Sequence, residues 1–322
     1  MIVLRSFTAA RILTAASLIS LLVLAKETHA QAKKPAKAKS ATTASLDSTT
    51  LINDLAFLAS DATEGRAAGT PGNIMAQQYI AKRFDSLGLI KTNGTYLQPF
   101  TFSNNNTNGT NVVGVIKGTR YPDSYIILSA HYDHLGKRDG KIYYGADDDA
   151  SGTACVMALA KYFKQHPPLH SLVLATFDAE ERGLQGSKYY ADHPFVSLDK
   201  MMIDVSLDMI SRNDSNQVYA SGTFHYPFLK KYVEQIQKAT PINLLMGHDD
   251  STKGRRDDWT NQSDHYSFHK NKIPFIYFGV EDHPDYHRPT DTFDKINKRF
   301  YFQVCTMIKD MALLLDKQQS LQ

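Results

Sequence analysis

The sequence predicts an α/β protein, a three-layer α/β/α sandwich with a mixed, mostly parallel central sheet. Two observations lead to this prediction. Short apolar runs rich in β-branched and aromatic residues have the composition of buried strands, and segments with helical spacing separate them. Strands that alternate with such helices form largely parallel sheets covered on both faces. In these folds the active site lies beyond the carboxyl ends of the strands.

The predicted elements follow one another along the chain after Asp47. The strands are expected at residues 112–116, 125–129, 172–177, 201–207 and 273–278, and the helices at 74–87, 152–165, 226–238 and 295–315. No internal repeat and no long Gly/Pro-rich break divides this part of the chain. We therefore expect residues 47–322 to form a single domain.

The N-terminus has the pattern of an export signal. Arg5 and Arg11 precede an apolar run over residues 12–25, and a small residue, Ala30, marks a plausible cleavage point. The run is shorter than the roughly 20 residues that a spanning helix needs. We therefore predict a signal peptide over residues 1–30, a Lys/Ala-rich linker over 31–46, no stable membrane anchor after cleavage, and a location in the periplasm or the medium.

The charge balance argues against nucleic acid as a partner. The formal net charge is +3, but residues 1–40 hold seven lysines and arginines against one acid. The rest of the chain is mildly acidic, which does not suit a phosphate-binding surface. The two cysteines, Cys155 and Cys305, lie inside predicted helices, and we expect buried free thiols, with a disulfide left open by export.

Histidines and acids gather near the ends of the predicted strands or in the loops that follow them. The clusters are His131-Tyr-Asp133, Asp147-Asp148-Asp149, Glu180-Glu181, Asp208, and the loop from Asp285 to Thr292 that contains His287 and precedes the last helix. The carboxyl ends of neighbouring parallel strands meet at one edge of a sheet. We therefore expect these clusters to lie close together.

Each cluster allows a structural and a chemical interpretation. Three successive acids can cap a helix, but they repel one another, and a divalent cation relieves this repulsion. His131 is either a surface histidine or a metal ligand whose second ring nitrogen donates to Asp133. In Glu180-Glu181, one carboxylate can bind a metal while the other takes a proton from water.

The combined set of side chains indicates zinc. Asp208 stands in an apolar stretch, where a carboxylate needs a partner or a metal. Two histidines with three carboxylates suit a pair of zinc ions better than calcium, whose ligands are oxygens. A structural zinc site would usually have thiolates, and the chain has only two cysteines.

The order of these motifs resembles the co-catalytic two-zinc exopeptidases, which include the secreted bacterial leucyl aminopeptidases and aminopeptidase Y. The motifs are His-x-Asp, Gly-Ala-Asp-Asp-Asp-Ala-Ser-Gly, Glu-Glu-x-Gly-x-x-Gly-Ser, Asp-Met-Ile and Tyr-His-x-Pro-x-Asp-Thr. The resemblance covers nearly everything after Asp47, with Gly65-Arg66 near its start and Ser263-Asp264-His265 near its end. It implies the zinc exopeptidase-like fold.

The resemblance also implies roles for individual residues. His131 and Asp208 would hold one Zn²⁺, Glu181 and His287 a second, and Asp148 would bridge the two ions. Within the acidic triplet, the resemblance alone selects Asp148. Glu180 would be the general base.

The implied activity is that of a zinc-dependent aminopeptidase. It would hydrolyse N-terminal residues from peptides through a water that bridges the metals and is activated by Glu180. Tyr286 would steady the oxyanion or simply pack, and His265 would line the pocket or cap a helix. The polar loop over residues 248–261 would border the substrate cleft or form an exposed loop.

Three other functions remain open on this scaffold. One is a glutaminyl-cyclase-like acyltransferase, which uses one zinc ion and has no need of a site built from His131 and Asp208. Another is a binding protein without catalysis, which would be expected to have lost Glu180 or a ligand. The third is a carboxypeptidase with the same metal ligands. The sequence predicts neither the preferred N-terminal residue of the substrate nor the oligomeric state.

Overall fold

The computed structural model describes residues 45–102, 107–254 and 257–321. The predicted signal peptide and nearly all of the predicted linker lie outside these residues. The chain from Ala44 to Gln322 is one compact unit. Its helices are α1 (Ser48–Leu58), α2 (Pro71–Ser86), α3 (Gly152–Gln165), α4 (Gln185–Asp192), α5 (Lys230–Gln237), α6 (His265–Lys270) and α7 (Lys298–Asp316).

The described residues form a mixed nine-stranded sheet and a small separate hairpin. The strands of the sheet are β1 (Ile90–Lys91), β2 (Leu97–Phe102), β3 (Thr107–Ile116), β4 (Tyr121–His131), β7 (His170–Phe177), β8 (Met201–Leu207), β9 (Gln217–Ser221), β10 (Asn243–Met246) and β11 (Phe275–Gly279). β5 (Gly136–Arg138) and β6 (Lys141–Tyr143) form the hairpin.

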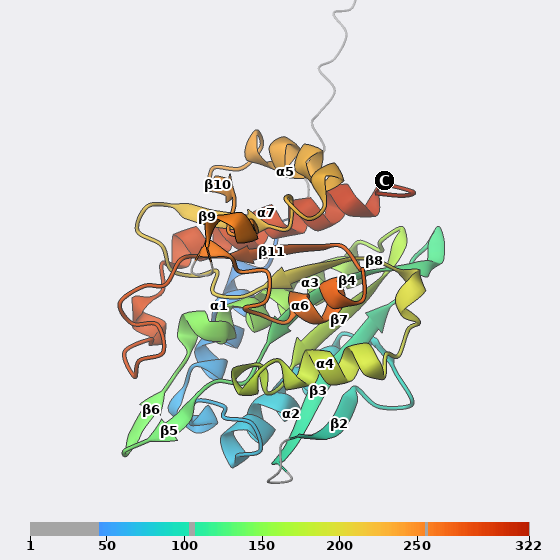
Figure 1. Cartoon of the computed structure of the whole chain (residues 1–322). Coiled ribbons are helices and arrows are strands. Elements are labelled where there is room, and N and C mark those ends of the chain that lie inside the picture. The colour runs from blue at the N-terminus through green and yellow to red at the C-terminus, as the bar shows by residue number, and fades with distance from the viewer. Residues whose placement is uncertain (1–44, 103–106, 255–256, 322) are drawn as a thin grey trace, which may run out of the picture. The chain divides into compact units, whose positions relative to one another are not determined.

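The parallel part of the sheet lies at its centre. The order is β1-β3-β7-β4-β8-β11-β9-β10, with β2 paired to β3 on the side. Strands β7, β4, β8 and β11 run parallel, whereas β3 and β9 join them in antiparallel fashion (Figure 1). The carboxyl ends of the four central strands therefore meet at one edge.

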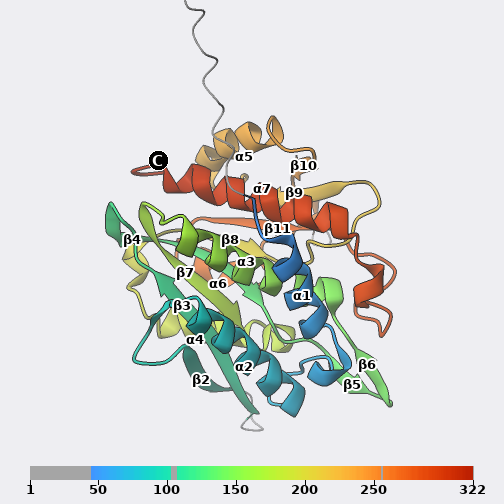
Figure 2. The same cartoon turned by 180° about the vertical axis from the view of Figure 1, so that it is seen from behind.

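Helices cover both faces of this sheet. Alternate side chains of β7 point to opposite faces: Leu172 and Leu174 join the core under α1, α2, α3 and α7, and Val173 and Ala175 join the core on the side of α4 and α6 (Figures 1 and 2). Every residue of β7 is buried. Burial on both faces explains why the sequence of this strand is apolar throughout.

The predicted elements agree with the structure where the pattern is long. The five predicted strands lie within β3, β4, β7, β8 and β11, apart from one or two residues at their ends, and the helix predicted at 152–165 is α3. The helix predicted at 226–238 begins as a 3₁₀ turn and becomes α-helical at Lys230. The helices α1, α4 and α6 and the short strands β1, β2, β5, β6, β9 and β10 were not predicted.

The two cysteines are as expected. Cys155 in α3 and Cys305 in α7 are buried free thiols. Among the residues that the structure describes, no helix has the length and apolar character needed to cross a bilayer.

Candidate metal centre

The register of the central strands brings the predicted ligands to one edge. Ser129 of β4 pairs with Ser206 of β8, so His131 and Asp208, each two residues further on, arrive side by side. On the other side of β4, His131 pairs with Phe177, the last residue of β7. A 3₁₀ turn that starts at Glu180 follows directly after β7.

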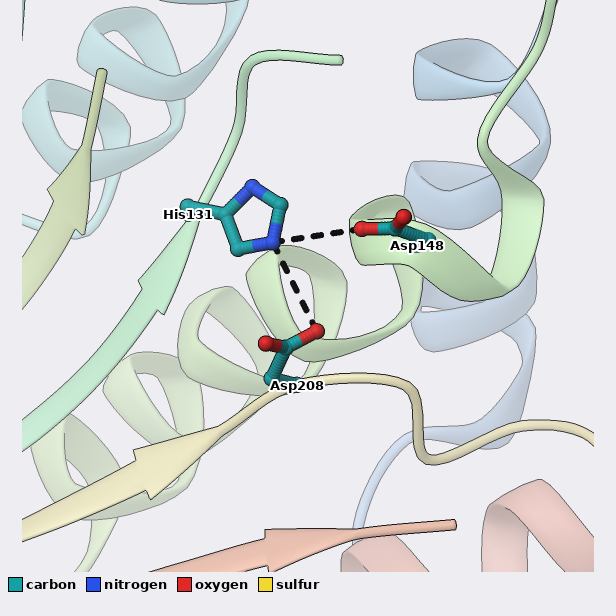
Figure 3. A group of neighbouring side chains, drawn as sticks. All are labelled: His131, Asp148 and Asp208. Atoms are coloured by element: carbon teal, nitrogen blue, oxygen red, sulfur yellow. Dashed lines mark ion pairs between the residues drawn. The ribbon is translucent and has the colours of Figure 1, made fainter. Parts of the chain in front are cut away.

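The first ligand group consists of His131, Asp148 and Asp208, all buried. The Nε2 atom of His131 lies 3.3 Å from Oδ1 of Asp148 and 3.5 Å from Oδ1 of Asp208 (Figure 3). The other ring nitrogen, Nδ1, lies 3.2 Å from the backbone oxygen of Asp133, an acceptor for its N–H. In the neutral imidazole this contact would leave the lone pair on Nε2, the nitrogen that faces both carboxylates.

The second group lies on the other side of Asp148. Oδ2 of Asp148 is 3.1 Å from Nε2 of His287, and this nitrogen is 3.3 Å from Oε2 of Glu181. The group also includes His134, whose Nδ1 is 2.8 Å from Oε1 of Glu181 and 3.6 Å from Oδ2 of Asp148. The two oxygens of Asp148 thus face two different groups, as a bridging carboxylate requires.

The neighbours of Asp148 serve the fold instead. Asp147 accepts hydrogen bonds from the backbone and hydroxyl of Ser211, and Asp149 accepts from the backbone N–H groups of His131, Gly152 and Met209. These donors satisfy the outer two carboxylates of the triplet. The middle carboxylate is left to face the histidines.

Backbone hydrogen bonds also position the loop that carries Asp148. Asp291 is fully buried, and its carboxylate accepts from the backbone N–H groups of Asp147 and Asp148. The chain departs from helical geometry at Asp148 and Asp149, which are joined by a cis peptide bond.

Asp133 lies beside His131, as predicted, and also contacts the turn that carries the two glutamates. Its nearest carboxylate oxygen is 3.6 Å from Nδ1 of His131, and its backbone oxygen makes the closer contact. The carboxylate accepts from the backbone N–H groups of Glu180, at 2.9 Å, and Glu181, at 3.3 Å. Asp133 thus positions the two glutamates through the backbone of the 3₁₀ turn that starts at Glu180.

Glu180 stands next to the first ligand group. Burial raises the pKa of Glu180 well above its usual range, and the charge of His131 acts in the opposite direction. Asp264 is its acidic neighbour: it is buried, neither of its carboxylate oxygens has a hydrogen-bond partner in the described residues, and burial raises its pKa to about 7. A carboxyl group with a raised pKa is suited to exchange protons near neutral pH.

Arg66 connects the loop that follows His131 to the loop that carries Asp148. Its side chain is fully buried and donates to the backbone oxygens of Leu58, Tyr132, Tyr144 and Gly145 at 2.6–2.8 Å. Tyr132 belongs to the loop of His131, and Gly145 begins the loop of Asp148. The motif Gly65-Arg66 was part of the sequence resemblance, but its function was not predicted.

The remaining two predicted residues differ in location. The ring of Tyr286 stacks on that of His287 at 3.9 Å between centroids, so it lies beside the second group. His265 is fully buried, its Nε2 lies 3.0 Å from the backbone oxygen of Trp259, and burial lowers its pKa to about 3. This position favours packing for His265 over the substrate contact considered above.

The polar loop over residues 248–261, as far as it is described, packs beside the first group. The rings of His248 and Trp259 stack at 3.8 Å, and Trp259 also contacts Tyr277. The Tyr277 hydroxyl lies 3.4 Å from the backbone oxygen of Asp208. The loop is therefore connected to the metal centre through one layer of aromatic rings.

The chemistry of these side chains fits zinc. Imidazole and carboxylate are zinc ligands, and Oδ1 of Asp208 and Oε1 of Glu181 are buried without hydrogen bonds. Burial disfavours protonation of His131, but Asp208 and Glu180 outweigh it and raise its pKa well above the usual range. Contacts with Asp148 and Glu181 likewise outweigh burial in His287 and raise its pKa to about 10. The negative field that holds these protons also attracts a cation.

A sheet covered on both faces, with two imidazole and carboxylate groups that share one aspartate at its carboxyl edge, has the layout of the zinc exopeptidase fold. The sequence model that describes peptidase family M28 matches residues 111–311, and the chain belongs to this family.

Individual relatives agree with the family. The chain is 27% identical to aminopeptidase YwaD of Bacillus subtilis over 228 residues, which are 67% of this chain and 46% of that protein. The chain thus matches less than half the length of this relative. It also resembles the structure of a zinc aminopeptidase from Bacillus subtilis, with a TM-score of 0.66 and 16% identity over 83% of this chain and 95% of that chain. A glutaminyl cyclase from Bacteroides thetaiotaomicron has a TM-score of 0.68 and 18% identity over 86% of this chain and 100% of that chain. At these identities the structural likeness shows the fold.

Proposed function

We propose that this protein is a two-zinc exopeptidase of the aminopeptidase type. The position of Asp148 is the observation that carries the proposal, because its two oxygens face His131 on one side and His287 on the other. His131 and Asp208 would hold one ion, Glu181 and His287 the other, with Asp148 between them. When bound, zinc lowers the pKa of water and polarises the scissile carbonyl.

Glu180 carries the protons in this reaction. It takes one from the water that attacks the peptide carbonyl and gives it to the amine that leaves. The carboxylate of Asp133 holds Glu180 in place by accepting a hydrogen bond from the backbone N–H of Glu180. Tyr286, stacked on His287, is placed beside the second group, where its hydroxyl would donate to the negative charge that develops on the carbonyl oxygen.

Peptides with a free N-terminus are the proposed substrates. By the resemblance to two-zinc aminopeptidases, the free α-amine of the substrate would bind at the metal centre, which would confine cleavage to the N-terminal residue. The name of the Bacillus relative, an aminopeptidase, supports this polarity. A shorter match, 34% identical over 116 residues to a glutamate carboxypeptidase 2 homolog of Caenorhabditis elegans, keeps the opposite polarity as the rival.

A substrate assay decides the polarity. The purified protein is tested on aminoacyl p-nitroanilides and on a peptide in free, N-acetylated and C-amidated forms, with and without a chelator. We expect chelator-sensitive release of the N-terminal residue and no cleavage of the acetylated form. Equal activity on the acetylated and free peptides would overturn the aminopeptidase assignment.

The variant Glu180→Gln tests the base. It should retain two zinc ions by metal analysis and lose at least about 10³-fold in kcat, within the range of general-base catalysis. Glu234→Gln in α5, a helix without site residues, is the matched control and should be unchanged. Turnover near the wild-type rate in Glu180→Gln would refute its role.

A glutaminyl cyclase is the second candidate, because a structure of that enzyme shares the fold. The group formed by His131 and Asp208 argues against it, since it supplies a second metal site. One zinc ion per chain at saturation, together with cyclisation of an N-terminal glutamine peptide, would favour the cyclase.

We further propose that the protein is exported. The basic residues and apolar run within residues 1–30 support a signal peptide that is cleaved. N-terminal sequencing of the protein from the periplasm and the medium tests this. An intact N-terminus in the cytoplasm would contradict export.

A further inference from the structure

His134 is a buried histidine beside the second ligand group that the predicted ligand set leaves out. Four histidines are fully buried in the described part of the chain: His131, His134, His170 and His265. In three of them a ring nitrogen lies within hydrogen-bond distance of a backbone oxygen, at 2.9–3.2 Å. Neither ring nitrogen of His134 makes a hydrogen bond. An unsatisfied buried polar group costs about 1–3 kcal/mol, so this imidazole needs another partner.

The Nδ1 atom of His134 points into the second ligand group. It is 2.8 Å from Oε1 of Glu181 and 3.6 Å from Oδ2 of Asp148. Despite the short distance, Oε1 of Glu181 also makes no hydrogen bond, so the two atoms are close without being aligned as donor and acceptor. Such an arrangement is typical of ligand atoms that converge on a common cation.

The rings of His134 and His287 face different oxygens of Glu181 and the same oxygen of Asp148. Oε1 of Glu181 faces His134, whereas Oε2 faces His287. Oδ2 of Asp148 lies near both rings. The rings are 5.8 Å apart between centroids, which leaves each one its own approach to the shared space.

Gly145 makes room for the ring of His134. A Cβ atom at this position would lie 2.5 Å from Cγ of His134 and 2.1 Å from the backbone oxygen of Asp148. The backbone of Gly145 also has a φ of +56°, which favours glycine. The loop that supplies Asp148 therefore begins at a residue without a side chain, directly against this imidazole.

We propose that His134 is a ligand of the second zinc ion, through Nδ1. This inference rests on the two-zinc function proposed above and adds one ligand to it. The second site would then have four protein ligands, His134, His287, Glu181 and the shared Asp148, all of the nitrogen and oxygen types that zinc binds. The first site has three: His131, Asp208 and Asp148.

The unequal ligand sets have a consequence for loading. The site with two imidazoles and two carboxylates binds a divalent metal more tightly than the site with one imidazole. The second site should therefore fill first when metal is added to the metal-free protein. The first site, with fewer protein ligands, keeps more positions for water and substrate.

The alternative is that His134 only positions Glu181 without touching the metal. Both cases place an imidazole beside a ligand, and loss of activity in a variant would not separate them. Counting the imidazoles bound to metal does separate them.

Cobalt substitution provides this count. In the Co²⁺-loaded protein, each ligating histidine with a free ring N–H gives one strongly shifted, exchangeable proton signal by NMR. We expect three signals at two equivalents of Co²⁺, two of which appear with the first equivalent. His134→Gln should lose one of these two. His166→Gln, which changes an exposed histidine at the end of α3, is the matched control and should keep all three.

Zinc affinity is the second measurement. Competition with a chromophoric chelator should show that His134→Gln weakens the tighter site by at least about 100-fold, the upper end of what loss of a residue that only orients a ligand causes. Two bound metals with two shifted signals in the wild-type protein would overturn the role of His134 and leave the proposed function standing. Saturation at one metal per chain would overturn the two-zinc function itself.

Discussion

The variant Arg66→Met tests whether one buried cation organises the metal centre. Methionine has a similar length and no hydrogen-bond donors, so it would leave the backbone oxygens of Leu58, Tyr132, Tyr144 and Gly145 without their partner. No carboxylate lies within ion-pair distance of Arg66 among the described residues, and burial lowers its pKa. The four carbonyls are its direct hydrogen-bond partners, and the charges of nearby aspartates, Asp148 foremost, also oppose the effect of burial.

The expected loss of stability follows from these contacts. A hydrogen bond to a charged group contributes about 1.5–3 kcal/mol, and four such bonds are lost. The gain from no longer burying a charge, several kcal/mol, offsets part of this loss. We expect a net loss of about 3–5 kcal/mol, a large part of the roughly 5–15 kcal/mol that stabilises a typical protein.

Urea denaturation of the metal-free protein measures this difference. Arg66→Met should lower the midpoint without changing the m-value, and Arg66→Lys, which keeps the charge but has fewer donors, should fall between it and the wild type. Arg120→Met changes an exposed arginine and should have little effect. A loss below about 1 kcal/mol in Arg66→Met would refute the reasoning, because it would mean that water or a rearranged loop satisfies the four carbonyls equally well.

Three further predictions concern the same centre. Gly145→Ala should destabilise the protein and weaken metal binding, because the added Cβ meets the backbone oxygen of Asp148. The control Gly140→Ala, also at positive φ but with nothing within 4 Å of its Cβ, should lose only about 1 kcal/mol of stability. Thermal denaturation measures both losses, and equal losses would contradict this prediction. Asp291→Asn should weaken zinc binding about 10- to 100-fold in equilibrium dialysis, since it holds the loop of Asp148; unchanged affinity would exclude that role. His131 and His287 have raised pKa values and are protonated at pH 7 without metal, so zinc binding should release roughly two protons, and affinity should rise with pH toward 10. Calorimetry in buffers of different ionisation enthalpy measures the release, and heat independent of the buffer would argue against it.

The sequence predicted the residues that follow long, apolar strands. His131 and Asp208 stand at or just after the ends of β4 and β8, and the parallel register brings them together whatever the loops do. Strands β9 and β10 were missed because five and four residues are too few for a clear pattern. The fold was thus predictable where burial on both faces imposes a long apolar run.

The details of the site depend on contacts that spacing does not encode. Whether the ring of His134 turns toward Glu181 is decided by the space over Gly145, some ten residues further along the chain. Whether Asp133 meets a ring nitrogen or two amides is decided by the 3₁₀ turn at Glu180. The choice of Asp148 from its triplet needed the family resemblance, and the hydrogen bonds of its neighbours now provide the physical reason.

The first part of the described chain has a consequence for dissecting this protein into fragments. The family match begins at residue 111, yet α1 lies before it, with Leu51, Leu55 and Leu58 fully buried in the core shared with α3. Removal of this segment would uncover the apolar side of the helix that follows the Asp148 loop. The smallest fragment able to fold around the metals should therefore start at or before α1, and limited proteolysis between α2 and β3 should leave two pieces that stay associated.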